Sequence, residues 1–96
     1  MNISHDGTTV SFKTEPEELF LAEKSGRKSN TVRVLDKKEY FRLVNLAPEK
    51  IVIQYQHEIF RRTISDSRVV GDLLGKLIVV LSWRDESEKE RSEDGS

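Results

Sequence analysis

Apolar and polar residues alternate in four segments of the chain, and this period of two is typical of β-strands that bury one face. The segments are 8–13, 29–35, 51–55 and 60–64. In the first segment the alternation places Val10 and Phe12 on the inward face. The last two segments are separated by a short connection near Gln56 and His57, so we expect a β-hairpin there.

Two other segments have the features of helices that pack one face against a sheet. Thr14 is in an N-cap position and Pro16 is in the first turn, which predicts a helix that runs to about Ser25. Asp36 and Glu39 form a capping-box pattern, which predicts a second helix that ends before Pro48. The expected inward residues are Leu19, Phe20 and Ala22 in the first helix and Tyr40, Leu43 and Val44 in the second.

The last third of the chain contains three segments of different composition. Residues 66–76 are polar and contain two glycines, so we expect a short helical turn or a partial strand. Residues 77–81 are all apolar and β-branched in the middle, which predicts a central strand buried on both faces. Residues 85–96 hold few apolar and many charged residues, and we expect this acidic C-terminal tail to be disordered.

The order of these elements predicts an α+β fold. We expect a small mixed or antiparallel sheet of about five strands with two helices. The sheet should curl towards a barrel, because closure protects the edges of so small a sheet. Ninety-six residues are enough for one domain, which we place at residues 1–84.

The net charge of −1 hides an uneven distribution. Residues 85–96 have six acidic and two basic residues, which leaves 11 acidic and 14 basic residues in 1–84, a net of +3. Without cysteine, and with only two isolated histidines, we expect no disulfide, metal or cofactor. No apolar run reaches the roughly 18 residues of a membrane span, and the first residues lack the pattern of a signal peptide. The expected location is therefore the cytoplasm, with no membrane partner.

Residues 25–35 concentrate the candidate chemistry. Gly26 follows an apolar-periodic run and predicts a helix that ends in the left-handed conformation. Beyond it, Thr31 and Arg33 share one face of a strand. Lys28 in a partly desolvated cleft beside Arg33 would have its charged form disfavoured, which makes a lysine reactive near neutral pH. The alternative interpretation is that Lys28 is solvated and Arg33 is paired with a nearby acidic residue.

Three residues of the predicted hairpin extend this candidate site. Arg61 and Arg62 would form a basic rim, and Tyr55 would stack on a base. The alternative is that the arginines are solvated and the tyrosine packs across the hairpin.

The run Gly26-Arg27-Lys28-Ser29-Asn30-Thr31-Val32-Arg33 resembles the G-x-K-x-x-[ET]-x-R signature of ASCH domains, which are PUA-like β-barrels associated with RNA. The version with threonine is similar to that of small bacterial acetylcytidine amidohydrolases. The resemblance covers eight residues strictly, and elsewhere only the order of elements agrees. It implies a barrel whose cleft lies beside this loop and strand.

The resemblance also implies a role for each matching residue. Lys28 would be the reactive or base-like group, Thr31 a hydroxyl that positions or attacks, and Arg33 a support or anion clamp. The amidohydrolases also need a glutamate between the hairpin and the last strand. This chain has only Asp66 and Asp72 as acidic residues there.

Three classes of function remain open. The first is a module that binds RNA or a nucleotide, with candidate binding residues Gly26, Arg27, Lys28, Thr31, Arg33, Tyr55, Arg61 and Arg62. The second is an amidohydrolase of a modified nucleoside, with Lys28 and Thr31 catalytic and an acid from Asp66, Asp72 or Glu58. The third is a protein-interaction or inhibitor module, such as a small accessory or phage-encoded protein, whose acidic tail binds a partner or aids solubility.

Overall fold

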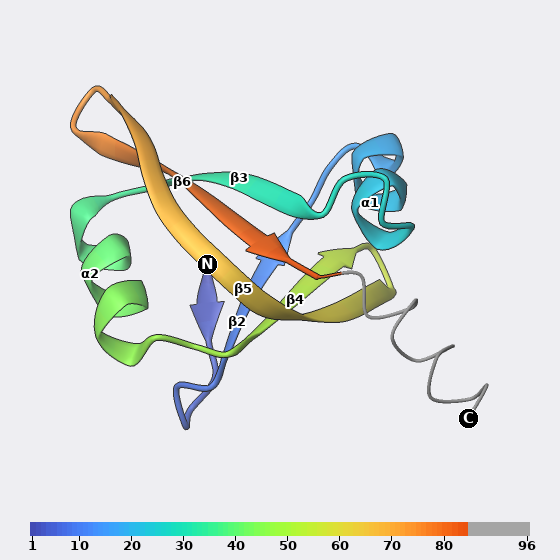
Figure 1. The fold of residues 1–96 in the computed structure, drawn as a ribbon, viewed down its shortest axis with the longest axis horizontal. Helices are drawn as coiled ribbons and strands as arrows, with labels where there is room; N and C mark the ends of the chain where they lie inside the picture. The colour runs from blue at the N-terminus through green and yellow to red at the C-terminus, as the bar shows by residue number, and fades with distance from the viewer. Residues whose placement is uncertain (85–96) are drawn as a thin grey trace.

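The computed structural model describes residues 1–84, which form two helices and a single six-stranded sheet (Figure 1). In chain order the elements are β1 (Asn2–Ile3), β2 (Thr9–Lys13), α1 (Glu17–Lys24), β3 (Asn30–Leu35), α2 (Lys37–Leu46), β4 (Lys50–Tyr55), β5 (Glu58–Leu73) and β6 (Lys76–Trp83). The expected disorder of the tail, 85–96, lies outside the described residues. The α+β class is confirmed, and the strand count is six because the chain also forms the short strand β1.

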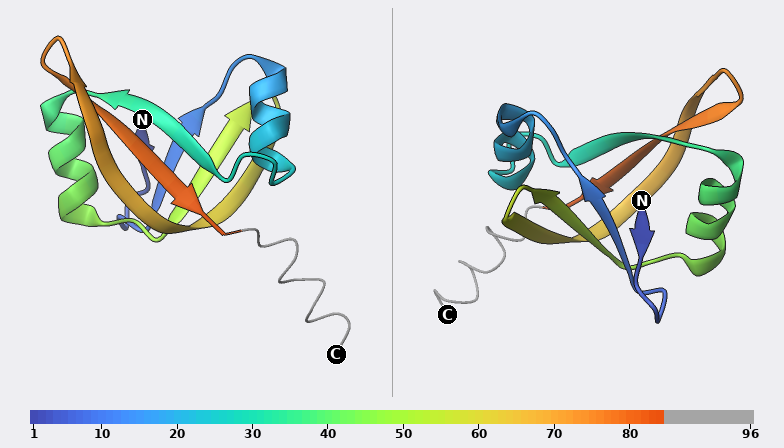
Figure 2. Two further views of the ribbon diagram at one scale, coloured as in Figure 1. Left: turned by 45° about the horizontal axis from the view of Figure 1, so that its top comes forward. Right: turned by 180° about the vertical axis from the view of Figure 1, so that it is seen from behind.

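The strand order is β1-β2-β4-β5-β6-β3, and only β2 and β4 are parallel. The sheet curls into a half-barrel, with α1 and α2 at opposite ends of it (Figure 2). Within residues 1–84, β3 pairs only with β6, so the half-barrel is open between β3 and the β1–β2 edge. Of the residues singled out in the sequence, Arg33 lines this opening.

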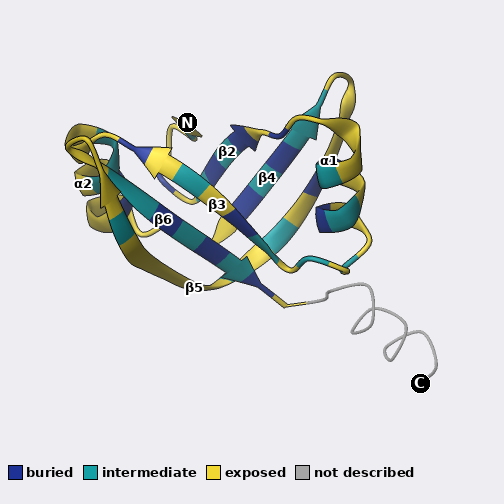
Figure 3. Ribbon diagram, turned by 90° about the horizontal axis from the view of Figure 1, so that it is seen from above, coloured by how far each residue is buried: buried dark blue, intermediate teal, exposed yellow. Residues whose placement is uncertain are grey.

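The core follows from the alternation of apolar residues along the strands. Its buried members are Val10, Phe12, Phe20, Leu35, Leu43, Ile51, Ile53, Phe60, Val79, Leu81 and Trp83. In Figure 3 buried residues recur along β2, β4 and β6. The expected inward positions of Val10 and Phe12 and the expected hairpin after Tyr55 are confirmed, because β4 pairs with β5 around that turn.

Of the two alternatives expected for residues 66–76, the strand is the one that forms, and 66–73 continue β5 and pair with β6. Two register shifts, between Ile64 and Asp66 and between Val69 and Gly71, break the period of two that identifies a strand in the sequence. The prediction that residues 77–81 are buried on both faces was wrong, since buried residues alternate with half-buried ones along β6. The helices cover the ends of the half-barrel, which leaves the outer face of β6 uncovered.

The helices need two corrections, one to the start of α1 and one to an inward position of α2. Thr14 is not the N-cap of α1; Pro16 holds that position, and Thr14 turns its side chain into the interior. In α2 the capping box of Asp36 and Glu39 is confirmed, with Glu39 N donating to Asp36 Oδ1 at 2.7 Å. The single buried residue of α2 is Leu43, whereas Val44 is 53% exposed. Among residues 1–84 there is no helix with the length and hydropathy needed to cross a membrane.

The turn between β5 and β6 gives a first test of the fold. Leu74 has a φ of 51° and is 98% exposed, and Gly75, which follows it, has a φ of 83°. Asparagine tolerates this left-handed conformation better than leucine does, so we expect Leu74→Asn to raise the free energy of unfolding by about 1 kcal/mol. Gly75→Ala should lower it by about 1 kcal/mol, because no atom lies near its Cβ position and only the conformation is strained. Urea denaturation of both variants checks the opposite signs.

Candidate functional site

Two of the three inward-facing residues of β3 are polar, Thr31 and Arg33, and the third is Leu35. Thr31 is only 2% exposed and Arg33 is half-buried, whereas Val32 and Val34 are 52% and 48% exposed. Apolar side chains normally occupy the buried face of a strand, so this inversion brings two polar groups into the half-barrel.

The turn after α1 brings Lys28 to the same region. Gly26 has a φ of 87°, which ends the helix as the sequence predicts. The backbone N–H of Lys28 then donates to the Ala22 carbonyl at 3.0 Å, so the chain folds back over the end of α1. This reversal directs the Lys28 side chain towards α1 at the start of β3.

The centre of the polar region is Glu23, which is fully buried on α1. Its Oε1 accepts a hydrogen bond from the Thr14 hydroxyl at 3.1 Å, and its Oε2 accepts one from Lys28 Nζ at 3.2 Å. Lys28 Nζ also donates to the Asn30 carbonyl at 2.9 Å. A buried carboxylate is tolerated only with such partners, because an uncompensated charge in the interior costs several kcal/mol.

Arg33 joins this network to the edge of the sheet. Its Nε donates to the Thr31 hydroxyl at 2.9 Å, its Nη1 to the Lys13 carbonyl at 2.7 Å, and its Nη2 to the Thr14 hydroxyl. The guanidinium also lies over the Phe12 ring, 4.7 Å from the centroid. These contacts fix the fork of Arg33 across the opening of the half-barrel. We call Thr14, Glu23, Lys28, Thr31 and Arg33 the Glu23 cluster.

The cluster holds two cationic side chains around one carboxylate. Burial lowers the pKa of the Arg33 guanidinium below its ordinary value, and attraction to Glu23 opposes that shift. An arginine remains charged in proteins despite such a shift, so the cluster keeps an excess of one positive charge. That excess favours an anion beside Arg33.

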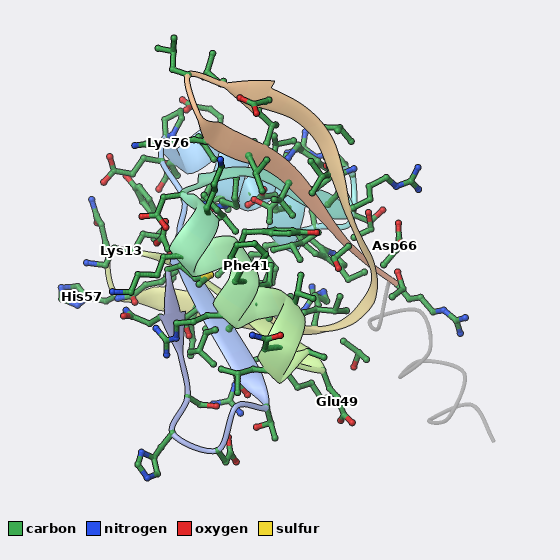
Figure 4. The ribbon with its side chains drawn as sticks, turned by 90° about the vertical axis from the view of Figure 1, so that its left-hand side faces the viewer. Lys13, Phe41, Glu49, His57, Asp66 and Lys76 are labelled. Carbon is green, nitrogen blue, oxygen red and sulfur yellow. The ribbon has the colours of Figure 1, made fainter. Side chains whose placement is uncertain are left out.

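A cleft of about 480 Å³ lies in the opening of the half-barrel, between β3 and the β1–β2 edge. Its walls are formed by Met1, Asn2, Ser11, Phe12, Lys13, Val32, Arg33, Val34, Leu35, Glu39 and Gln54. Arg33 is the one member of the Glu23 cluster that lines it. Lys13 is exposed at the end of β2, and Figure 4 shows its side chain extending away from the ribbon. The cleft therefore presents two cationic side chains, Arg33, which is fixed, and Lys13 at the rim. The one carboxylate among its walls, Glu39, lies 3.9 Å from the Met1 ammonium.

The remaining sequence candidates lie outside the walls of this cleft. Tyr55 packs its ring 5.7 Å from that of Phe20, and Arg62 donates to the Lys24 carbonyl at 2.8 Å. Arg27 donates to the Ser25 hydroxyl at 3.2 Å, and Arg61 is exposed on β5. Gly26, Lys28 and Thr31 also do not line it. A binding or catalytic role for these residues stays a prediction.

Sequence reasoning missed Glu23, Thr14, Lys13 and Gln54. A signal for Glu23 is present, because it follows Phe20 by three residues and so shares its face of the helix. A charged residue at a position expected to be buried indicates a functional or structural polar site, whereas an apolar residue there indicates only the core. Lys13 and Gln54 approach the cleft through the parallel pairing of β2 with β4, which no local pattern reveals.

Among residues 1–84 no group of three or more histidine, cysteine, aspartate or glutamate side chains is arranged to hold a metal ion. No family model, no curated protein and no solved structure matches the chain.

Proposed function

We propose that the chain is a small binding module that holds RNA or a nucleotide in the cleft between β2 and β3. The observation that carries the proposal is Arg33, whose guanidinium is fixed across the cleft by three hydrogen bonds. An arginine has five N–H donors, so two remain for a ligand. A phosphate accepts such paired donors and a nearby lysine in the way this site offers them.

The rest of the cleft suits the other parts of a nucleotide. A volume of about 480 Å³ falls within the range of about 300–1,000 Å³ for small-molecule sites. Asn2 and Gln54 line it, and side-chain amides both donate and accept hydrogen bonds at base edges. The Gln54 Nε2 group donates to the Gln56 carbonyl at 2.9 Å, which leaves its oxygen as an acceptor. We also propose that the chain is an ASCH-like domain, on the basis of its Gly26–Arg33 motif and the curled sheet behind it.

The test is a titration of a short fluorescent single-stranded RNA with the full chain at 50 and 200 mM salt, read by anisotropy. We expect Kd to rise with salt, because phosphate binding releases counterions. Lys13→Ala should weaken binding about threefold and reduce the slope of log Kd against log salt by about 0.7. Lys76→Ala removes the same charge from the exposed start of β6, outside the cleft, and should leave Kd unchanged. A salt-independent Kd, or equal losses in both variants, would contradict the proposal.

A second candidate is hydrolysis of an acetylated nucleoside, which one contact favours. Glu23 places a carboxylate 3.2 Å from Lys28 Nζ. The sequence had offered only Asp66, Asp72 or Glu58 as the acidic residue of an amidohydrolase. In the reaction, the Thr31 hydroxyl would attack the acetyl carbonyl, and its proton would pass to the departing cytidine amine. Water would then hydrolyse the acetyl-threonine ester to acetate and restore the hydroxyl. We rank it second because Thr31 is only 2% exposed and its hydroxyl accepts from Arg33.

Acetate release from acetylcytidine distinguishes the two candidates. The amidohydrolase proposal requires release that is lost in Lys28→Ala and retained in Lys76→Ala. If the wild-type chain binds RNA and releases no acetate, the binding proposal stands alone.

A further inference from the structure

Within residues 1–84 no strand pairs with the second edge of β3, so the backbone groups of that edge face the cleft. In an antiparallel pair, alternate residues direct both backbone groups at the partner strand. Trp83 N donates to Ser29 O, so Ser29 directs its backbone groups at β6. Every second residue after it, namely Thr31, Arg33 and Leu35, does the same. The intervening residues Val32 and Val34 must then direct their N–H and C=O groups away from β6. The hydrogen bond from Lys28 Nζ to the Asn30 carbonyl agrees with this phase.

The opposite wall of the cleft also has an uncovered edge. Thr14 N donates to Gln54 O, and Lys50 N donates to Thr8 O. The even-numbered residues of β2 therefore direct their backbone groups at β4, and Lys13 directs its backbone groups at the gap. β1 covers only Val10 and Ser11 of that edge. Arg33 Nη1 donates to the Lys13 carbonyl at 2.7 Å, so a side chain bridges the gap where a strand is missing.

The size of the cleft fits a short extended segment. One residue of a strand occupies about 3.3 Å along its axis, about 4.8 Å towards its neighbour and about 10 Å through the sheet, or about 160 Å³. A cleft of about 480 Å³ therefore holds about three residues. A folded second copy of the chain is too large for this space.

We propose that the cleft binds an extended segment of a partner protein, which adds to β3 as a strand and closes the half-barrel. The residues beside Val32 and Val34 face outward, where β-branched side chains pack well against exposed valines. The residue between them faces inward beside Arg33, where a carboxylate replaces the Lys13 carbonyl as acceptor. The preferred sequence is thus apolar, acidic, apolar, in the manner of β-strand addition.

This proposal goes beyond nucleic-acid binding and adds the backbone of β3 to the binding groups, while both ligands share Arg33. The partner strand depends on the backbone of Val32 and Val34, whereas RNA depends on the side chains of Arg33 and Lys13. Because both ligands place an anion on Arg33, they exclude each other.

The probe is the blocked peptide acetyl-Thr-Val-Glu-Val-Thr-amide, followed by NMR of the full chain. Binding should slow amide exchange of Val32 and Val34 at least tenfold and leave that of Arg33, already bonded to β6, nearly unchanged. Methylation of both valine nitrogens of the peptide removes the two backbone N–H groups that would donate to β3. Replacement of its glutamate by lysine reverses the charge of the side chain that would face Arg33. Each change should weaken binding at least tenfold.

Val34→Pro is the protein variant that corresponds to the methylated peptide. It removes a backbone N–H that faces the gap and is not part of the β3–β6 ladder. It should fold and lose the peptide, and the RNA titration is made on the wild-type chain. Peptide binding without protection of Val32 and Val34, equal binding of the methylated peptide, or no binding by the wild-type chain would overturn the strand proposal. RNA binding of the wild-type chain is judged separately, so either proposal can fail alone.

Discussion

Replacement of Glu23 by alanine is expected to lower the free energy of unfolding by about 3 kcal/mol. The substitution leaves the Lys28 ammonium and the Thr14 hydroxyl without the carboxylate that accepts their hydrogen bonds. It also removes the charge that Arg33 faces. Breaking a buried ion pair typically costs about 3–5 kcal/mol, and we expect the lower end because Lys28 reaches solvent. Urea denaturation followed by far-UV circular dichroism gives the value.

Glu58 provides a matched control, since its carboxylate also pairs with a lysine, Lys24, at 3.5 Å. Both partners of that pair are exposed, so Glu58→Ala should cost less than about 1 kcal/mol. Glu23→Gln keeps the side-chain volume and separates the loss of charge from the creation of a cavity. Equal costs for Glu23→Ala and Glu58→Ala would show that Glu23 does not stabilise the interior.

The second large effect is expected at Arg33. Arg33→Lys keeps the charge but loses the planar fork that spans Thr14, Thr31 and the Lys13 carbonyl. We expect the Kd for single-stranded RNA to rise about tenfold, which corresponds to about 1.4 kcal/mol, with an unchanged salt slope. Arg33→Gln should weaken binding further and reduce the slope by about 0.7, because one phosphate contact is lost.

Thermal unfolding of both Arg33 variants shows whether the loss of binding follows from loss of fold. Titrations are made well below the measured midpoint of each variant. If Arg33→Lys binds as tightly as the wild-type chain, charge alone accounts for binding and the fixed geometry of Arg33 has no role.

The sequence was informative where the determinants are local, with the N-cap of α1 as the exception. The strand alternation, the Gly26 helix end and the Asp36–Glu39 capping box each depend on neighbouring residues, and each is present in the structure. The grouping of Thr31 with Arg33 on one face of β3 also follows from the period of two.

What the sequence did not reveal depends on contacts between distant segments. Glu23 becomes the centre of the site only because α1 packs over the end of the half-barrel and the next turn brings Lys28 back. For the distal part of β5 the sequence left a helical turn and a partial strand open, because extra residues at its register shifts interrupt the alternation. Lys13 and Arg33 are 20 residues apart and meet only across the open edge of the sheet.

The most direct test of the account is the NMR signal of the Arg33 side chain during titration with single-stranded RNA. If Arg33 is the anion-binding group of the cleft, its Nε–H resonance and the backbone amides of Lys13 and Gln54 should shift together with one affinity. The signals of Arg61 and Arg62 should remain in place. Shifts confined to Arg61 and Arg62, with Arg33 unchanged at saturation, would contradict the assignment of the cleft as the binding site.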